Sequence, residues 1–492
     1  MSNLWVKKPL SLLLSEAADS EKGLKRTLSA TNLVLLGIGA IIGAGLFVRT
    51  AAAASEDAGA AVTISFIIGA IGCAFAGLCY AEFAAMIPIA GSAYTYSYAT
   101  MGELVAWIIG WDLVLEYALG AATVAIAWSE YLNKFIELFI GVQYQIPYEW
   151  CHSPLQTSDT GVQGILNLPA LFILLLLTLI LIKGIQESAM VNGIIVVIKV
   201  AIVLLFIFLG WAYINPLNHV PYIASPSTYL DSTGQEKIFP GGWMGILRGA
   251  GVIFFAYIGF DAVSTAAQEA KNPKRDMPIG ILGSLAICTI LYILFAHVLT
   301  GIAHYSEFRT AGREASVAYV ITTYMKEYLW LAKFVTVAIL FGFSSVILVM
   351  LLGQSRVFYS MSRDGLVPKI FSDLHTTYRT PYKSNFILFI FIGLFAAFIP
   401  GDIVGDMSSI GTLFAFVLVS LGVIIMRRRN PEADRPFKTP LVPIIPILGA
   451  LICGAMIFGL GWENWMRLIV WLIIGFVIYF GYGIKNSKLQ KQ

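Results

Sequence analysis

The sequence predicts an all-α protein that crosses a lipid bilayer many times. Of its 492 residues, 58% are hydrophobic and only 12% are charged, and the mean hydropathy is +0.79. A soluble chain carries about a quarter of its residues as charges, so this chain has too few to cover a surface in water. Apolar runs long enough for a helix to cross a bilayer recur throughout. Because these runs are continuous rather than alternating, they predict helices and not a barrel.

The apolar runs predict twelve spans in a single membrane domain, residues 31–483, between a polar segment, 1–30, and a short tail, 484–492. A net charge of +3 does not favour a nucleic acid partner, and the five cysteines and five histidines show no metal-binding spacing. The expected spans are 31–54, 60–84, 102–135, 167–184, 190–214, 242–265, 278–302, 330–359, 384–400, 404–426, 441–461 and 464–483.

Basic residues are concentrated on one side of the predicted spans. The positive-inside rule makes this side cytoplasmic, so both termini are expected inside, in a plasma (inner) membrane. The predicted inner residues are Lys7, Lys8, Lys22, Lys25, Arg26, Lys271, Lys274, Arg275, Arg363, Lys369, Arg379, Lys383, Arg427, Arg428, Arg429, Arg435, Lys438, Lys485, Lys488 and Lys491. The opposite loops carry few, among them Lys237, Arg309, Arg313, Lys326 and Arg467.

The first and sixth spans contain sequences that an ordinary spanning helix avoids. Four glycines fall within Gly37–Gly45, and each weakens a helix by about 1 kcal/mol. The sixth span contains Phe254–Asp261 with Gly259 inside it. We expect the two spans to be unwound near Gly43–Gly45 and Ala256–Gly259. Interrupted spans at matching places of two halves indicate a transporter binding site, here in repeats of about 31–214 and 242–426, followed by extra helices at 441–483. An alternative for the first span alone is tight helix packing through a small-xxx-small pattern.

An unwound segment in a membrane exposes backbone groups of both kinds. Amide N–H groups at a half-helix N-terminus attract a carboxylate, and freed carbonyls attract an ammonium. Two such segments together suit a small molecule that carries both groups, as an amino acid does.

Ionisable groups inside a span are functional candidates because their charge is costly there. Lys199 lies in the middle of its span, where a desolvated amine is able to exchange a proton; a fixed cation that joins two helices is the alternative. Glu116 is a candidate for contact with a substrate ammonium, for proton uptake or for helix contact. Glu82 and Asp261 are interpreted as structural polar groups.

Taken in order, these motifs resemble the amino acid–polyamine–organocation (APC) superfamily, and within it the bacterial relatives of the cationic amino acid transporters. The resemblance covers nearly the whole chain, and the ordered set is far more specific than any one piece. The motifs are Gly37–Phe47, Cys79–Phe83, Pro88–Tyr94, Gly110–Tyr117, Phe255–Asp261, Glu269, Asn272-Pro273, Arg275–Pro278, Arg363–Leu366 and Pro368.

The resemblance implies the LeuT-type fold, a five-plus-five inverted repeat with two C-terminal helices. It implies that a substrate carboxylate meets the amides around Gly43, Ala44 and Gly45, although Ala44 departs from members with a hydroxyl there. It implies an ammonium site at carbonyls near Ile41, Phe255, Ala256 and Ile258, lined by Glu116. It also places Lys199 where sodium-coupled relatives hold a sodium ion, facing the Gly39 and Ile42 carbonyls and Ser344 or Ser345.

These features predict a secondary active transporter without a cofactor, driven by a proton gradient, with an amino acid and the lipid bilayer as its partners. Met350, Phe255 and Ile258 are expected to form an apolar pocket, which favours small neutral L-amino acids such as alanine. The alternative is an exchanger or uniporter for cationic amino acids, with Glu116 pairing the cation. A membrane enzyme is disfavoured because the sequence shows no nucleophile–base set or cofactor motif. Accessory subunits are not predictable from this sequence.

Overall fold

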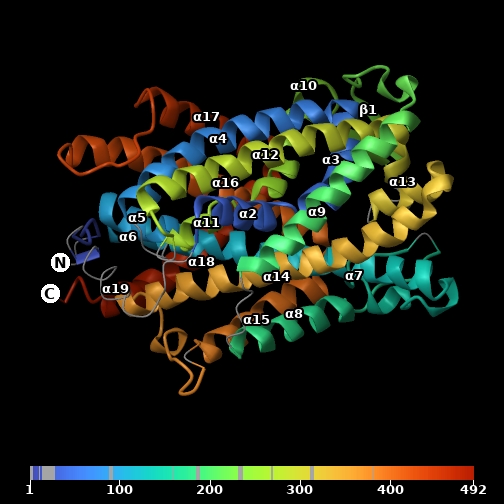
Figure 1. Cartoon of the computed structure of the whole chain (residues 1–492). Helices are drawn as coiled ribbons and strands as arrows, with labels where there is room; N and C mark the ends of the chain where they lie inside the picture. The colour runs from blue at the N-terminus through green and yellow to red at the C-terminus, as the bar shows by residue number, and fades with distance from the viewer. Residues whose placement is uncertain are drawn as a thin grey trace.

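The computed structural model describes residues 4–9, 12–13, 28–87, 92–158, 160–183, 189–230, 236–267, 270–310, 315–378 and 380–491, and the side chains of 189–192 are not included. Some residues singled out above lie outside these ranges: Lys22, Lys25, Arg26, the segment 88–91, Glu269, Arg313 and Arg379. The described part is a bundle of long helices that run roughly between two ends (Figure 1).

The helices of the first half follow the expected spans closely. They are α2 (Ala30–Ile41), η1 (Gly45–Arg49), α3 (Thr50–Ala53), η2 (Ala54–Ala58), η3 (Gly59–Ala61), α4 (Val62–Met86), α5 (Ser92–Thr100), α6 (Glu103–Val114), η4 (Leu115–Leu119), α7 (Gly120–Phe139), α8 (Leu168–Ile182) and α9 (Ala189–Gly210). Residues 55–59, between the first two expected spans, also form helical turns, and Gly59, with φ +63°, ends η2.

The second half contains the helices α10 (Gly242–Ile253), η9 (Phe254–Tyr257), α11 (Ala262–Thr265), α12 (Pro273–Ile302), α13 (Ser316–Tyr324), α14 (Leu329–Asp364), α15 (Tyr382–Phe398), α16 (Gly401–Arg429), α17 (Ile444–Gly459), α18 (Trp462–Ile478), η14 (Tyr479–Gly483) and α19 (Ile484–Asn486). The all-α expectation missed one antiparallel hairpin, β1 (Ser227–Leu230) paired with β2 (Glu236–Phe239), in which Ser227 faces Phe239.

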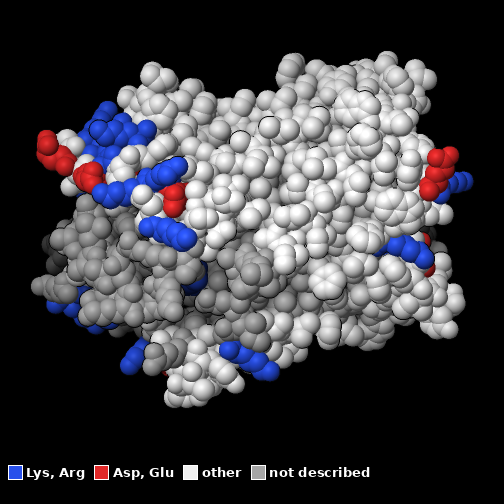
Figure 2. Space-filling view, viewed as in Figure 1, with Lys and Arg blue, Asp and Glu red and all other residues white. Residues whose placement is uncertain are grey.

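Membrane-spanning character is confirmed by length and composition. Eight described helical segments are long and apolar enough to cross a bilayer, and four shorter apolar helices accompany them: Ala30–Ile41, Leu168–Ile182, Tyr382–Phe398 and Ile444–Gly459. Figure 2 shows a wide uncharged surface between the two ends of the bundle, as a lipid-facing belt requires. The protein is therefore a polytopic helical membrane protein.

Both ends of the described chain meet at one end of the bundle (Figure 1). The Glu103 amide donates to the Val6 carbonyl (2.9 Å), and the Lys488 amide donates to the Asp364 carbonyl (3.0 Å). The Lys8 ammonium lies 2.8 Å from the Asp364 carboxylate. In Figure 2 the Lys and Arg side chains in view also gather mainly towards this end. The two terminal segments thus close the end that the charge pattern predicts to be cytoplasmic.

Broken helix α2 lies inside the bundle, where it packs against α9, α12 and α14. The second broken helix, formed by α10, η9 and α11, packs against α4, α16 and η1. This arrangement brings the two glycine-containing interruptions to the interior, away from lipid.

Candidate functional site

The first interruption falls at the end of α2. The Ile42 amide still donates to the Ile38 carbonyl (2.9 Å), but Ile42 itself is extended, with ψ 99°. The chain bends at Ile42 and Gly43, and helical geometry resumes at Ala44 (φ −58°, ψ −26°). The expected unwinding at Gly43–Gly45 is therefore displaced towards Ile42, because Ala44 and Gly45 already open the next helical segment. The first amides of a helix have no partner within it, so this start is suited to a carboxylate.

The second interruption separates η9 from α11. Ile258 is extended (ψ 135°), and Gly259 has φ +111°, a conformation that residues with a Cβ rarely adopt. The helix resumes only at Ala262. The sixth span is interrupted as predicted, but the break is shifted from Ala256–Gly259 to residues 258–261, because Ala256 and Tyr257 still belong to η9.

The two interruptions are in direct backbone contact. A Cβ on Gly45 would overlap the Cα of Ala256, and a Cβ on Gly259 would lie 3.0 Å from the Ala40 carbonyl oxygen. Glycine at both crossing points lets the two broken helices approach this closely. The contact brings the carbonyls of one break beside the other, as a site shared by both breaks requires.

Lys199 reaches the first break from α9. Its side chain is buried, and its ammonium donates to the Gly39 carbonyl (3.0 Å) and the Ile42 carbonyl (3.2 Å). The methylene stem passes α14 at Gly342, where a Cβ would lie 2.7 Å from Cε of the lysine. Ser345 is buried three residues further on the same helix, which puts both residues on one face. Ser344 instead donates to the Leu340 carbonyl of its own helix (2.9 Å).

Tyr292 of α12, which is not among the predicted site residues, contacts both broken helices. Its hydroxyl lies 2.9 Å from the Ile41 carbonyl oxygen and 3.0 Å from the Ala256 carbonyl oxygen. The Phe255 carbonyl accepts the Ile258 amide (3.3 Å). Several carbonyls expected to face an ammonium therefore have protein donors in this structure. No sequence motif marks Tyr292, because its partners lie far away along the chain.

Two buried carboxyl groups, those of Glu116 and Asp261, lie next to each other near the second break. Glu116 is fully buried in η4, and its carboxyl group lies beside that of Asp261. The Tyr117 hydroxyl donates to Asp261 at 2.5 Å. The predicted pocket residue Met350 is also buried and packs against Gly120, where a Cβ would lie 2.9 Å from its sulfur. The structure thus places Glu116, a predicted site residue, beside Asp261, which was interpreted from the sequence as a structural polar group.

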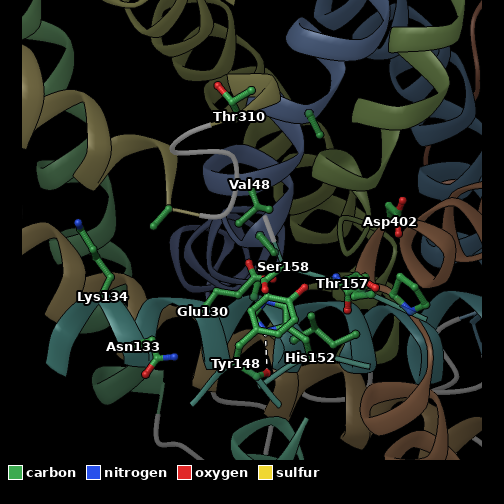
Figure 3. A pocket seen from close by; sticks show the side chains of 18 of the residues that line it. Val48, Glu130, Asn133, Lys134, Tyr148, His152, Thr157, Ser158, Thr310 and Asp402 are labelled. Atoms are coloured by element: carbon green, nitrogen blue, oxygen red, sulfur yellow. Dashed lines mark hydrogen bonds between the residues drawn. The ribbon is translucent and has the colours of Figure 1, made fainter. Parts of the chain in front are cut away.

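A cavity of about 1200 Å³ is lined by residues of α7, by the segment after α7, and by Ala44 beside the first break. Figure 3 shows side chains of α7 and of the segment after it around the cavity, among them Glu130, Tyr148 and His152. Ala44 is the predicted substrate residue that lines its inner part, whereas Gly43, Gly45 and the other predicted residues are not among its walls. The cavity therefore reaches the N-terminal turn of η1.

Arg49 lines the same cavity one turn after Ala44. It is almost fully buried and forms an ion pair with Asp406 of α16. A charge inside an apolar span is a functional signal that is visible in the sequence, and Arg49 is a site residue missing from the predicted set. The pair joins the first broken helix to α16 beside the cavity.

Comparison with known proteins agrees with this architecture. The profile described as "Amino acid permease" matches residues 28–481. The chain is 43% identical over 489 residues to the branched-chain amino acid permease BcaP of Bacillus subtilis (strain 168), covering 99% of each chain. It is 40% identical over 491 residues to the methylthioribose transporter of the same bacterium, covering 100% of both.

A eukaryotic relative shares the same core. The vacuolar cationic amino acid transporter 4 of Arabidopsis thaliana is 33% identical over 424 residues, which is 84% of this chain and 65% of the relative. The chain therefore belongs to the amino acid permease family of the APC superfamily, whose members are membrane transporters and not enzymes.

Proposed function

We propose that this protein is a secondary active transporter that carries a neutral L-amino acid together with a proton by alternating access. The observation that carries the proposal is the contact between two broken helices, with Lys199 bound to the carbonyls of the first. A half-helix start accepts a carboxylate and free carbonyls accept an ammonium. Such a site recognises both ends of an amino acid without a dedicated charged side chain.

The proposed architecture has twelve spans, ten of them in a LeuT-type inverted repeat at about 31–214 and 242–426. The positions of the two breaks support this repeat, because they fall in the first and the sixth expected spans. We further propose that both termini are cytoplasmic in the plasma membrane. The cavity then opens to the outside, and the terminal segments close the inside.

The proposed substrates are small or branched neutral L-amino acids. Met350 and the apolar residues Phe255 and Ile258 are buried near the breaks, where they would exclude a charged side chain. The name of the Bacillus subtilis relative BcaP favours the same class. Glu116 beside Asp261 supports the alternative of a cationic substrate, which such a carboxyl pair would bind. A thiosugar such as methylthioribose is a second candidate, favoured by the 40% identical relative.

Lys199 is the proposed coupling residue. When protonated, its ammonium bridges the Gly39 and Ile42 carbonyls and holds the break in the substrate-binding shape. When neutral, the lysine binds these carbonyls more weakly, which allows α9 to shift relative to α2. By linkage, substrate binding then strengthens proton binding by the same factor that the proton strengthens substrate binding. One proton would travel with each amino acid.

Uptake into proteoliposomes tests the proposal. We expect labelled L-alanine, L-valine or L-leucine to accumulate when an inward proton gradient is imposed without sodium, and to equilibrate without accumulation when the gradient is absent. Unlabelled neutral amino acids should compete, whereas arginine and methylthioribose should not. Inhibition by arginine alone would establish the cationic alternative, and inhibition by methylthioribose alone would establish the thiosugar.

A further inference from the structure

The carbonyl groups at the end of α2 accept hydrogen bonds from side chains of other helices. The last turn of a helix leaves its carbonyls without partners within the helix, and leaving a buried carbonyl unpaired is destabilising. In this structure the Gly39 and Ile42 carbonyls are bound by Lys199. The Ile41 carbonyl is bound by Tyr292. The break is thus held by two side chains from two different helices.

Tyr292 differs from Lys199 in the number of protons that it offers. Its hydroxyl lies within hydrogen-bonding distance of the Ile41 and Ala256 carbonyls, at 2.9 and 3.0 Å. A phenol carries a single proton, so it donates to one of these carbonyls at a time. The other carbonyl, on the opposite break, then lacks a full hydrogen bond at that moment.

The ring of Tyr292 has no freedom to leave this position easily. The residue is fully buried, and its ring packs at 5.5 Å from the rings of both Phe66 and Tyr257. This packing fixes the hydroxyl between the two broken helices. A substrate ammonium has three donors, so it is able to donate to both carbonyls at once.

We propose that Tyr292 is a positioning residue whose hydroxyl stands in for the substrate ammonium between the two broken helices, an inference that rests on the proposed amino acid transport. In the free protein, the hydroxyl caps one of the two carbonyls. When substrate binds, the ammonium takes one carbonyl and the hydroxyl donates to the other. The residue thereby stabilises the free state and lowers the net gain on binding, which aids release.

This role predicts an unusual direction of change. Tyr292→Phe keeps the ring but leaves both carbonyls uncapped in the free protein. An ammonium then gains one more hydrogen bond on binding than it gains in the unmodified protein. Because a net hydrogen bond is worth about 0.5–1.5 kcal/mol, the Kd for substrate should fall by about two- to tenfold. A residue with only a packing role would leave Kd unchanged or raise it.

Replacement of Tyr292 by 4-aminophenylalanine provides the opposite change. Its amino group has two protons and caps both carbonyls at once, so substrate should bind several-fold more weakly than in the unmodified protein. This variant also keeps every contact of the ring, so it keeps the inference testable where Tyr292→Phe fails to fold. The matched control is Tyr257→Phe, which removes another buried tyrosine bond to a backbone carbonyl, that of Phe66 at 3.0 Å.

The measurement is the Kd of purified full-length protein for L-alanine and L-leucine by titration calorimetry, beside the melting temperature of each variant. Tighter binding by Tyr292→Phe and weaker binding by the amino variant, both relative to Tyr257→Phe, would support the inference. Equal or weaker binding by Tyr292→Phe, or unchanged binding by the amino variant, would overturn it. If the unmodified protein binds neither amino acid, the proposed function has failed and the stand-in role falls with it.

Discussion

The backbone of Gly45 rests directly on the backbone of Ala256, and a single added carbon at Gly45 would overlap the Ala256 Cα. This contact joins the first broken helix to the second. Unlike a clash with the end of a flexible side chain, it cannot be relieved by a rotamer change, because the obstructing atoms belong to the main chain. At this crossing point the separation of the two broken helices therefore depends on a residue without a side chain.

Gly45→Ala is expected to abolish uptake and to lower the melting temperature of the purified protein. The methyl group forces the two breaks apart, and overpacking of this kind costs about 1–3 kcal/mol or more. Uptake and thermal unfolding in detergent measure the two effects. Gly454→Ala is the matched control, since a Cβ there meets nothing within 4 Å. Normal uptake by Gly45→Ala would show that the breaks need not touch.

The buried carboxylate of Glu82 is expected to stabilise the fold at the end that carries the termini. It accepts hydrogen bonds from Arg427 (3.0 and 2.7 Å) and from the Thr439 amide (2.8 Å). Removing one partner of a buried pair costs about 3–5 kcal/mol. Glu82→Ala should therefore melt many degrees below the unmodified protein.

An exposed pair at the same end supplies the comparison for Glu82. Lys274 and Asp434 lie 3.0 Å apart with most of both side chains exposed, and such pairs contribute about 0–1 kcal/mol. Asp434→Ala should hardly change the melting temperature. Similar melting temperatures for Glu82→Ala and Asp434→Ala would contradict a structural role for Glu82.

Acid should weaken the segment that follows α9. Burial, together with the neighbouring His297, lowers the pKa of His219 below its ordinary value of 6.5. The unfolded chain then binds a proton at this residue more readily than the folded chain, so stability is complete above about pH 6.5 and declines as the pH falls towards the folded pKa. Melting temperatures at pH 7.5 and 5.5 measure the decline. His219→Asn should reduce it, and an equal decline in both proteins would exclude His219 as a cause.

Much of the fold is readable from the sequence because its causes are local. Apolar runs set the positions of the helices, and the glycines of Gly37–Gly45 and Gly259 mark where helices break. The exact break was displaced because the Ile42 amide still completes the last turn of α2, which no composition rule reveals. The short hairpin β1–β2 was missed because two four-residue strands outside the apolar runs give little signal.

The contacts within the candidate site depend on long-range geometry and were less predictable. The Lys199 contacts with Gly39 and Ile42 agree with the resemblance, because a buried ammonium needs oxygen partners. Tyr292 carries no such demand, since a tyrosine in a span is usually a packing or interface residue. The partners Arg49 and Asp406 are separated by 357 residues. A single sequence shows that each charge needs a partner but not which residue supplies it.

Lys199 gives the sharpest prediction about energy coupling. Its ammonium holds the first break through two carbonyls and passes α14 at Gly342. Lys199→Ala removes the ammonium that donates to both carbonyls, while the backbone of α9 stays intact. We expect the variant to lose accumulation driven by an inward proton gradient, with binding or exchange of substrate partly retained.

The measurement is uptake of L-alanine or L-leucine with the proton gradient imposed and sodium absent, beside counterflow exchange without a gradient. Lys333→Ala is the matched control, because this lysine lies on the same helix as Gly342 but is exposed; it should accumulate substrate normally. Loss of accumulation with retained counterflow assigns coupling to Lys199, since a merely misfolded protein would lose both. If Lys199→Ala accumulates substrate as well as the unmodified protein does, the lysine is a fixed structural cation. The coupling proton then belongs elsewhere, and Glu116, buried beside Asp261, is the group to substitute next.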